Sequence, residues 1–393
     1  MVFGAPPLQY KTSFRPMFTE NSTPICHLCG SKDISVYPDA FRYKRVTSDC
    51  KLWNTGGNLA QCASCNTVQS LITNHWRAEA EQIYKHYEVY HQGEGVEQAV
   101  FDASGASQTR SIKLVSKLCD EIELNQTGRI LDIGCANGNF LRAFGSTYPD
   151  WQLSGAEFDS KHASELSSLE KFKQLYTGGI KKIDQRFDFV SMIHTLEHIE
   201  NPLPFLIAAR ELLTPRGYIF IQVPHYRENP FELMTYDHAS HFDVSTLCHL
   251  LHSASLFPIH ISTDWVSKEI SLLASTSESR RTSADVAGWD VKECLEWMEK
   301  LIKRAQTIQA NSQLFGIFGS SIAATWTAAN LPRLPDFFVD EDAARIGRKH
   351  LDREIIPPTD APLNSSVFVA LQPAIQKQIL NKYLYKRNNA FFG

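Results

Sequence analysis

One segment of this 393-residue chain constrains its fold more than any other: an apolar stretch, a turn with two glycines and the start of a helix. The stretch covers residues 129–133, and the turn follows as GCANG at residues 134–138. Glycine tolerates a positive φ and lets a ligand approach the backbone, and the first turn of a helix presents unpaired N–H groups. The segment therefore predicts a ligand-binding turn. A dinucleotide-binding turn reads GxGxxG, whereas this one reads GxAxG, which disfavours NAD.

Apolar stretches and helical patterns alternate through the middle of the chain. Strands are predicted at residues 129–133, 151–157, 187–193 and 218–223, and helices at residues 138–146 and 202–213. Strands that alternate with helices pair in parallel, so the predicted fold class is α/β with a layered sheet. Sites in such folds lie at the carboxyl ends of the strands.

An acidic residue ends the second predicted strand, about 20 residues after the glycine turn. This residue is Glu157. A carboxylate at that place can accept hydrogen bonds from both hydroxyls of a ribose. The alternative is an exposed helix cap, but the glycine turn before it favours the ribose role.

Four of the nine cysteines form two CxxC pairs in a loop-rich region: Cys26, Cys29, Cys62 and Cys65. Two such turns supply four thiolates in a tetrahedron, which suits Zn²⁺. Incidental cysteines or a redox pair are the alternatives, and Cys50, His27 and His75 are candidate substitute ligands. We expect a structural zinc ion without a catalytic role, because a four-cysteine site is coordinatively closed.

Composition and charge exclude several classes of protein. The net charge is −4 and the pI about 6.4, so a basic surface for nucleic acid or a charged membrane is not expected. The mean hydropathy is −0.25, and no apolar run is long enough to cross a bilayer. Residues 1–7 do not resemble a secretory signal, and the cysteine pattern fits reduced thiols, so a cytoplasmic location is expected.

The chain divides into three regions by its patterning. Residues 1–75 carry the cysteine pairs and are predicted to form a zinc-binding domain. Residues 76–275 begin with a helical lead-in and contain the alternating strands and helices. A polar stretch at residues 275–283 is the predicted linker. Residues 276–393 then continue with a helix at 291–309 and a second, smaller strand–turn–helix region from Leu314.

Histidines gather after the predicted strand at residues 218–223. His225 follows that strand directly, and residues 236–242 contain Asp237, His238 and His241. Histidine titrates near neutral pH and suits proton transfer. Packing or loop capping is the alternative for each histidine alone, but the density of the group favours a functional site.

A rival motif overlaps the strand predicted at residues 187–193. His194-Thr195-Leu196-Glu197-His198 spells HxxEH, the zinc signature of inverted metalloproteases, which must lie on a helix. Here the motif follows an apolar strand and precedes Asn201-Pro202, so a loop is expected instead. A peptidase would require a second zinc ion.

Residues 129 to about 257 resemble the class I S-adenosylmethionine (SAM)-dependent methyltransferases, which have a Rossmann-like sheet. The glycine turn resembles their motif I, residues 187–202 their fourth strand, and residues 212–218 the turn into their fifth strand. Ala136 stands where a glycine is common, and the third strand lacks an evident acid near residues 176–179, so the adenine amino contact stays unassigned. The resemblance implies that SAM contacts the following residues: Asp132, Gly134, Ala136, Gly138, Glu157, Met192, Ile193 and His194.

The layout of the whole chain resembles a narrower group, the zinc-containing three-domain sugar C-methyltransferases that act on nucleotide-linked keto-deoxysugars. Their C-terminal domain is a nucleotide-fold-like α/β domain. The resemblance implies that His238 is the base and that Asp237 is its partner. A tyrosine before the SAM domain also contributes in this group, and residues 83–90 offer Tyr84, Tyr87 and Tyr90, of which we take Tyr87.

The leading hypothesis is therefore a zinc-containing, SAM-dependent methyltransferase of a small molecule, with methylation of a carbon atom of a nucleotide-linked sugar as the expected reaction. His238 would be the base, oriented by Asp237, with His225 or a tyrosine polarising the substrate. His241 stands where the sugar group often has tyrosine, which leaves an O- or N-methyltransferase of another metabolite or of a surface-polysaccharide sugar as an alternative. A zinc-stabilised sugar-nucleotide-binding or scaffold protein without catalysis is the third.

Overall fold

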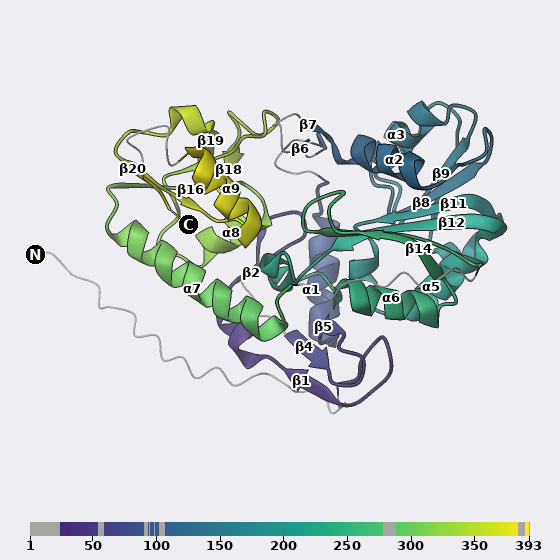
Figure 1. Ribbon diagram of the computed structural model, residues 1–393, viewed down its shortest axis with the longest axis horizontal. Coiled ribbons are helices and arrows are strands. Elements are labelled where there is room, and N and C mark those ends of the chain that lie inside the picture. Colours follow the sequence, from purple (N-terminus) through teal and green to yellow (C-terminus); the bar gives the residue numbers. More distant parts are fainter. Residues whose placement is uncertain are drawn as a thin grey trace, which may run out of the picture.

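A seven-stranded sheet carries the glycine turn in the computed structural model (Figure 1), which describes residues 24–53, 59–89, 93, 95–97, 99–101, 107–277, 288–383 and 390–392. The strand order is β10-β9-β8-β11-β12-β15-β14, and β15 alone in this sheet runs antiparallel to its neighbours. The bounds are β8 Arg129–Ile133, β9 Gln152–Glu157, β10 Phe172–Thr177, β11 Phe187–Ile193, β12 Leu213–Pro224, β14 Phe257–Ser262 and β15 Glu269–Ser275.

Helices cover both faces of this sheet. Helices α2 (Arg110–Glu121) and α3 (Asn139–Thr147) lie on one face, and α5 (Pro202–Glu211) and α6 (Val244–Ser253) on the other (Figure 1). The apolar side chains of each helix pack into a separate buried cluster, one on each side of the sheet. The α/β layered architecture predicted from the alternating pattern is confirmed. Short helices α4 (Ala163–Ser167), η3 (Ile180–Lys182) and η4 (Leu196–His198) lie in the connections.

Most of the predicted strand bounds agree closely with the structure, and one differs. β8 and β11 have the predicted bounds, whereas β12 begins at Leu213, five residues before the predicted start. The pairing of β12 with β11 shifts register between Phe187 and Phe189, so an irregularity absorbs the extra residues. Pro215 and Gly217, which predict a turn, are accommodated there.

A four-stranded antiparallel sheet joins the N-terminal region to the histidine-rich segment. Its order is β1 (Ile34–Val36), β4 (Leu59–Cys62), β5 (Val68–Ser70) and β13 (Ser240–His241). Near it lie β2 (Arg45–Val46), β3 (Leu52–Trp53), η1 (Pro38–Arg42), η5 (Pro230–Met234) and α1 (Asn74–Lys85). The hairpin of β6 (Ala99–Phe101) with β7 (Ser107–Thr109) lies apart from it, beside α2 (Figure 1). Strand β13 thus brings the histidines against the strand that follows the second cysteine pair.

A second, six-stranded sheet occupies the C-terminal region. Its order is β18 (Lys349–His350), β19 (Arg353–Ile356), β17 (Phe337–Val339), β16 (Leu314–Phe318), β20 (Ser365–Val369) and β21 (Ala390–Phe392), with β18 alone antiparallel. Helices α7 (Val291–Ala310), α8 (Ile322–Ala329) and α9 (Pro373–Tyr383) accompany it, with η6 (Pro358–Asp360) before β20. Of the predicted linker, only residues 275–277 lie within the described residues.

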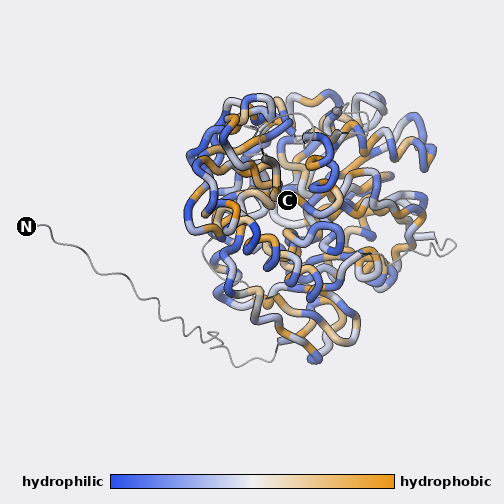
Figure 2. Tube along the Cα trace, turned by 60° about the vertical axis from the view of Figure 1, so that its left-hand side comes forward, coloured by the Kyte–Doolittle hydropathy of each residue, from blue (hydrophilic) through white to orange (hydrophobic). Residues whose placement is uncertain are grey.

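Hydrophobic and hydrophilic residues alternate over short distances along the trace (Figure 2). No helix in the part of the chain that the structure describes is both long and apolar enough to cross a membrane.

Trp326 on α8 joins the C-terminal sheet to the rest of the molecule. Its ring is fully buried and lies 5.3 Å from the ring of Tyr43 and 5.7 Å from that of Phe231. Trp326→Ala should lower the free energy of unfolding by about 3–5 kcal/mol. The substitution would leave a cavity between three segments of the chain, and the surrounding side chains cannot move in to fill it. Urea denaturation checks this, with Trp326→Phe expected to lose less; an unchanged midpoint for Trp326→Ala would contradict it.

Candidate functional site

The glycine turn adopts a backbone that only small residues fit. Gly134, Ala136 and Gly138 have φ values of 78°, 46° and 79°. A Cβ at Gly134 would lie 2.1 Å from the Thr195 hydroxyl oxygen, and one at Gly138 would lie 2.7 Å from Leu166. The turn is therefore held tightly between β8 and the loop that follows β11.

Glu157 lies directly beside this turn. Its Oε1 accepts a hydrogen bond from the Ala136 N–H (2.6 Å), and its Oε2 accepts one from the Phe158 N–H (3.1 Å). Burial raises the pKa of this carboxyl, and the two N–H donors oppose the shift. The arrangement fixes the carboxylate beside the glycine turn, and its contact with a ribose stays a prediction.

Phe158 is a residue that sequence reasoning missed. Its side chain is 91% exposed, although it follows a strand whose other residues are largely buried. A large aromatic ring left in solvent beside a fixed carboxylate offers a flat apolar surface for a ligand. The signal in the sequence was an aromatic residue immediately after the strand-end acid.

Asp132 lies on β8 just before the turn, and a residue of the neighbouring strand β11 holds its side chain. The Asp132 carboxylate is buried and accepts a hydrogen bond from the Ser191 hydroxyl (2.7 Å). Burial raises its pKa to about 7, and the Ser191 bond limits the shift. The side chain of Met192 is buried in the hydrophobic core on one face of the sheet. Ile193 is partly buried on the other face of the strand.

Buried histidines and carboxylates meet at the same edge of the sheet. His238 and His241 both direct Nδ1 at the same oxygen of Glu232, at 2.5 and 3.1 Å. The His198 ring lies 4.7 Å from the ring of His238. Burial lowers the pKa of His238 and of His198 to about 4, so both rings are neutral. We call Glu197, His198, Glu232, His238 and His241 the acid–histidine cluster.

The predicted role of Asp237 needs correction. Its carboxylate oxygens accept hydrogen bonds from the N–H and the hydroxyl of Ser48, at 2.8 and 2.5 Å. The carboxylate that contacts His238 is that of Glu232, because η5 turns it inward from the apolar run around Phe231. A single acid inside that apolar run was the sequence signal for Glu232.

Tyr84 is the tyrosine that reaches the cluster. Its hydroxyl lies 3.1 Å from Nδ1 of His198 and donates to the backbone carbonyl of Asp237 (3.1 Å). Tyr87, the predicted contributor, is half-buried, and its carbonyl accepts a hydrogen bond from the Lys161 side chain (2.8 Å). Tyr90 lies outside the described residues.

The two other predicted histidines contact different carboxylates. Nδ1 of His225 lies 3.5 Å from Glu228. His194 lies between Glu197 and Glu269, at 3.2 Å from Nδ1 and 3.4 Å from Nε2. His194 has a φ of 51° directly after β11, and only a 3-10 turn follows at residues 196–198. The HxxEH motif therefore lies in a strand-end loop, as expected, and not on the helix that a metalloprotease needs.

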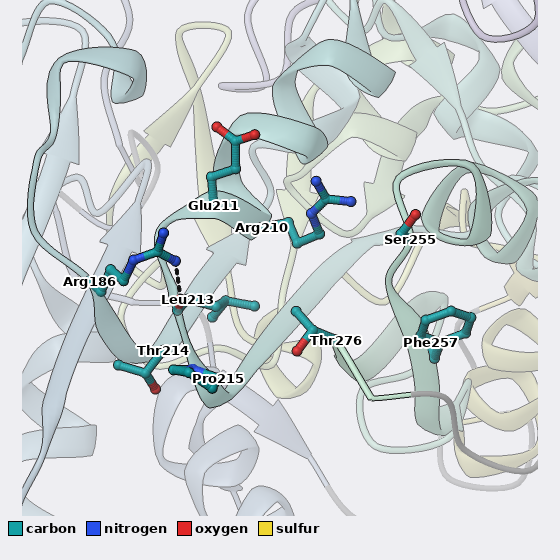
Figure 3. Close-up of a pocket in the computed structure, with 9 residues that line it drawn as sticks. All are labelled: Arg186, Arg210, Glu211, Leu213, Thr214, Pro215, Ser255, Phe257 and Thr276. Atoms are coloured by element: carbon teal, nitrogen blue, oxygen red, sulfur yellow. Dashed lines mark hydrogen bonds between the residues drawn. The ribbon is translucent and has the colours of Figure 1, made fainter.

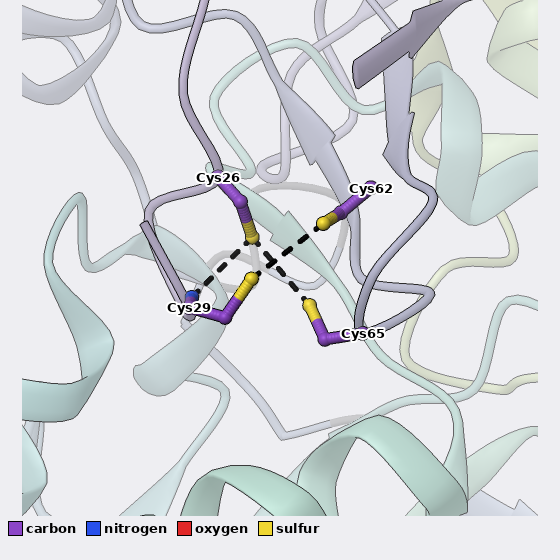
Figure 4. A group of neighbouring side chains, drawn as sticks. All are labelled: Cys26, Cys29, Cys62 and Cys65. Carbon is purple, nitrogen blue, oxygen red and sulfur yellow. Dashed lines mark hydrogen bonds between the residues drawn. The ribbon is translucent and has the colours of Figure 1, made fainter. Parts of the chain in front are cut away.

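The four cysteines of the CxxC pairs converge on one point (Figure 4). The sulfur atoms of Cys26 and Cys65 lie 3.6 Å apart, as do those of Cys29 and Cys62, and all four lie within 4.8 Å of one another. Tetrahedral Zn²⁺ with bonds of about 2.3 Å holds its sulfurs roughly 3.8 Å apart, so this donor set fits zinc.

The substitute zinc ligands considered from the sequence have other contacts. Nε2 of His27 lies 2.9 Å from the Ser240 hydroxyl, and His75 pairs with Glu79. The backbone carbonyl of Cys50 accepts a hydrogen bond from the hydroxyl of Thr325 on α8.

A hollow of about 370 Å³ lies at the opposite edge of the large sheet (Figure 3). It is lined at the amino ends of β11, β12 and β14 by side chains that include Arg186, Arg210 and Phe257. Because the glycine turn and the acid–histidine cluster both lie at the carboxyl ends of the parallel strands, this hollow is not part of the candidate site.

Comparison with known proteins agrees with this geometry. Residues 107–260 match a family model described as a methyltransferase domain. An uncharacterized methyltransferase from Schizosaccharomyces pombe is 26% identical over 110 residues, which cover 24% of this chain and 40% of that protein. A ubiquinone biosynthesis O-methyltransferase from Cereibacter sphaeroides is 29% identical over 96 residues, 23% of this chain and 38% of that protein. The chain thus matches about 40% of the length of these curated relatives.

Among solved structures, CalO1, a methyltransferase in calicheamicin biosynthesis in its SAH-bound form, is similar at a TM-score of 0.37 and 15% identity. That match covers 51% of this chain and 58% of the other. The matched residues 107–260, together with β15, form an α/β fold of class I methyltransferase type with a mixed central sheet. The family model and the curated relatives support the enzyme class predicted from the sequence, a SAM-dependent methyltransferase.

The raised pKa of Asp132 predicts a stability that depends on pH. The folded pKa of about 7 exceeds the unfolded value of about 3.9, so folding binds a proton between these values and wild-type stability falls as pH rises from 4 to 7. Asp132→Asn removes this loss. Its free energy of unfolding relative to wild type should rise by up to about 4 kcal/mol between pH 4 and pH 8.

Urea denaturation at the two pH values measures this difference. Asp120→Asn, at an exposed position on α2, is the matched control and should follow wild type. Parallel pH profiles for wild type and Asp132→Asn would show that Asp132 does not titrate in this range.

Proposed function

We propose that this protein transfers the methyl group of SAM to a small acceptor that binds between the glycine turn and the acid–histidine cluster. The observation that carries the proposal is that both groups lie at the carboxyl ends of the parallel strands of one sheet. The loop after β11 joins them, because Thr195 packs on Gly134 while His198 belongs to the cluster. The methyl group of the donor and the attacking atom of the acceptor have to lie next to each other, and this edge of the sheet can hold both molecules.

The cofactor side of the proposal uses the residues around the turn. Thr195 and Leu166 fill the space beside Gly134 and Gly138, which holds the turn in one shape. We assign the methionine part of SAM to the backbone of this turn and the ribose hydroxyls to Glu157. Phe158 stacks on the adenine, which accounts for its exposure. SAM supplies the electrophilic methyl group when it is bound.

The acceptor side uses neutral His238. Its Nδ1–H donates to Glu232, which leaves Nε2 as the atom that takes a proton from the acceptor. Glu232 holds the ring in this tautomer and stabilises the charged form that results. Tyr84 and His198 line the same cluster, so they are candidates to orient the acceptor.

For the acceptor itself we propose a nucleotide-linked sugar, methylated on oxygen. The oxygen is favoured by the curated relatives, which include O-methyltransferases. The sugar nucleotide is favoured by the order of a four-cysteine group, a methyltransferase domain and a C-terminal parallel sheet along one chain. Methylation of carbon beside a ketone is the second candidate, and Zn²⁺ at the four cysteines would stabilise the N-terminal sheet in either case.

Binding of S-adenosylhomocysteine tests the cofactor site. Wild type should bind it with micromolar affinity in isothermal titration calorimetry, and Glu157→Ala should weaken binding at least tenfold, because the ribose hydroxyls lose a charged acceptor. Asp159→Ala, two residues further along the same loop, is the control and should bind like wild type. Equal affinity for all three proteins would remove Glu157 from the site.

Turnover tests the role of His238. Methyl transfer from labelled SAM to a panel of nucleotide-linked sugars should fall by at least 100-fold in His238→Ala, while S-adenosylhomocysteine still binds. His249→Ala, at an exposed position on α6, should keep the wild-type rate. Mass spectrometry of the product separates O- from C-methylation, and a near-normal rate in His238→Ala would show that His238 has no part in the chemistry.

A further inference from the structure

Three side chains of the acid–histidine cluster are arranged as ligands of one metal ion. Glu197, His198 and His238 each offer a ligand atom, and these atoms lie within 4.8 Å of one another. Glu197 is 1% and His238 3% exposed, while the His198 side chain retains 18% exposure. The group is therefore enclosed on most sides and open through His198.

Both histidine rings have the orientation that a metal-binding histidine has. Nδ1 of His198 lies 3.2 Å from the backbone carbonyl of Asp237, and Nδ1 of His238 lies 2.5 Å from Glu232. Metal-binding histidines donate the N–H of one ring nitrogen to a carbonyl or carboxylate and bind the metal through the other. Because Nδ1 of each ring already has a hydrogen-bond partner, Nε2 of each ring is the atom that would bind the metal.

The carboxylate of Glu197 gives a second indication of a metal site, independent of the orientation of the histidines. Both oxygens of its carboxylate are buried and have no hydrogen-bond partner, because the contact of Oε1 with Nδ1 of His194 at 3.2 Å lacks the geometry of a hydrogen bond. A buried carboxylate without a partner is costly. The backbone N–H of Ala239 donates to the carbonyl of Glu197 (2.7 Å), so this carboxylate is tied to the segment that carries His238.

We propose that Glu197, His198 and His238 bind a divalent transition-metal ion, with Zn²⁺ as the first candidate. Two histidines and one glutamate, with a fourth position left open, are the ligands of catalytic zinc sites. This set excludes His194 and so differs from the HxxEH arrangement, and it is separate from the four cysteines. The open position takes an oxygen of the acceptor.

This inference rests on the proposed function and changes one step of it. A hydroxyl bound to the ion releases its proton to solvent, because the metal lowers the pKa of the hydroxyl. The bond from that oxygen to the methyl carbon then forms as the carbon–sulfur bond breaks, and the sulfur keeps the electron pair. His238 is a ligand in this state, and the ion takes over the role of activating the acceptor.

The metal content of the protein tests the inference without an acceptor. Wild type saturated with ZnCl₂ and then dialysed should contain two zinc ions per chain by elemental analysis, one at the cysteines and one at the cluster. The double variant Glu197→Gln, His198→Ala should contain one. The matched control Glu200→Gln, His249→Ala, which changes an exposed ion pair and an exposed helix residue, should contain two.

The outcomes separate this inference from the proposed function. One zinc ion in wild type, or two in the double variant, would overturn the metal site, and the wild-type value decides even where the double variant does not fold. Calorimetry with S-adenosylhomocysteine on the same samples tests the cofactor site independently. Binding with only one zinc ion leaves the methyltransferase and rejects the metal; two zinc ions without binding reject the methyltransferase.

Discussion

Parallel pairing of β8 with β9 and β11 is the constraint on which the candidate site depends. It sends the chain out of the sheet at one edge three times, at Gly134, at Glu157 and at His194. The turn fits only because Thr195, from the third of these exits, occupies the space that a side chain at Gly134 would need. The geometry of the cofactor site is thus a property of the sheet and not of any single loop.

The local part of this design could be predicted from the sequence. The strand, turn and helix at residues 129–147 depend on neighbours in the chain, and the position of Glu157 at the end of the next strand needed only the apolar pattern that precedes it. The early start of β12 could not be predicted, because it depends on an irregular pairing with β11 in which Pro215 and Gly217 are tolerated.

The contacts between individual side chains of the acid–histidine cluster could not be predicted from the sequence, for a different reason. The resemblance to the sugar methyltransferases implied that Asp237 and His238 act as a pair, yet the backbone turns their side chains to different neighbours. Ser48, 189 residues away, takes the carboxylate of Asp237, while Glu232 meets His238 from a short 3-10 turn. Such contacts follow from packing between segments that are distant in the chain. The sequence shows that Glu232 is a single acid in an apolar run, but it does not show which side chain that acid meets.

The glycine turn and the acid–histidine cluster differ in how many segments of the chain build them. The glycine turn and Glu157 are built within about 30 consecutive residues, whereas the segment around His238 is fastened to Ser48, to Ser70 and to α1. The backbone of the turn therefore comes from one stretch of the chain and needs only close packing by Thr195 and Leu166 from outside it. The acid–histidine cluster depends on contacts between the N-terminal region and the segment after β12. Under the proposed function, a change of acceptor would therefore require changes in both of these regions.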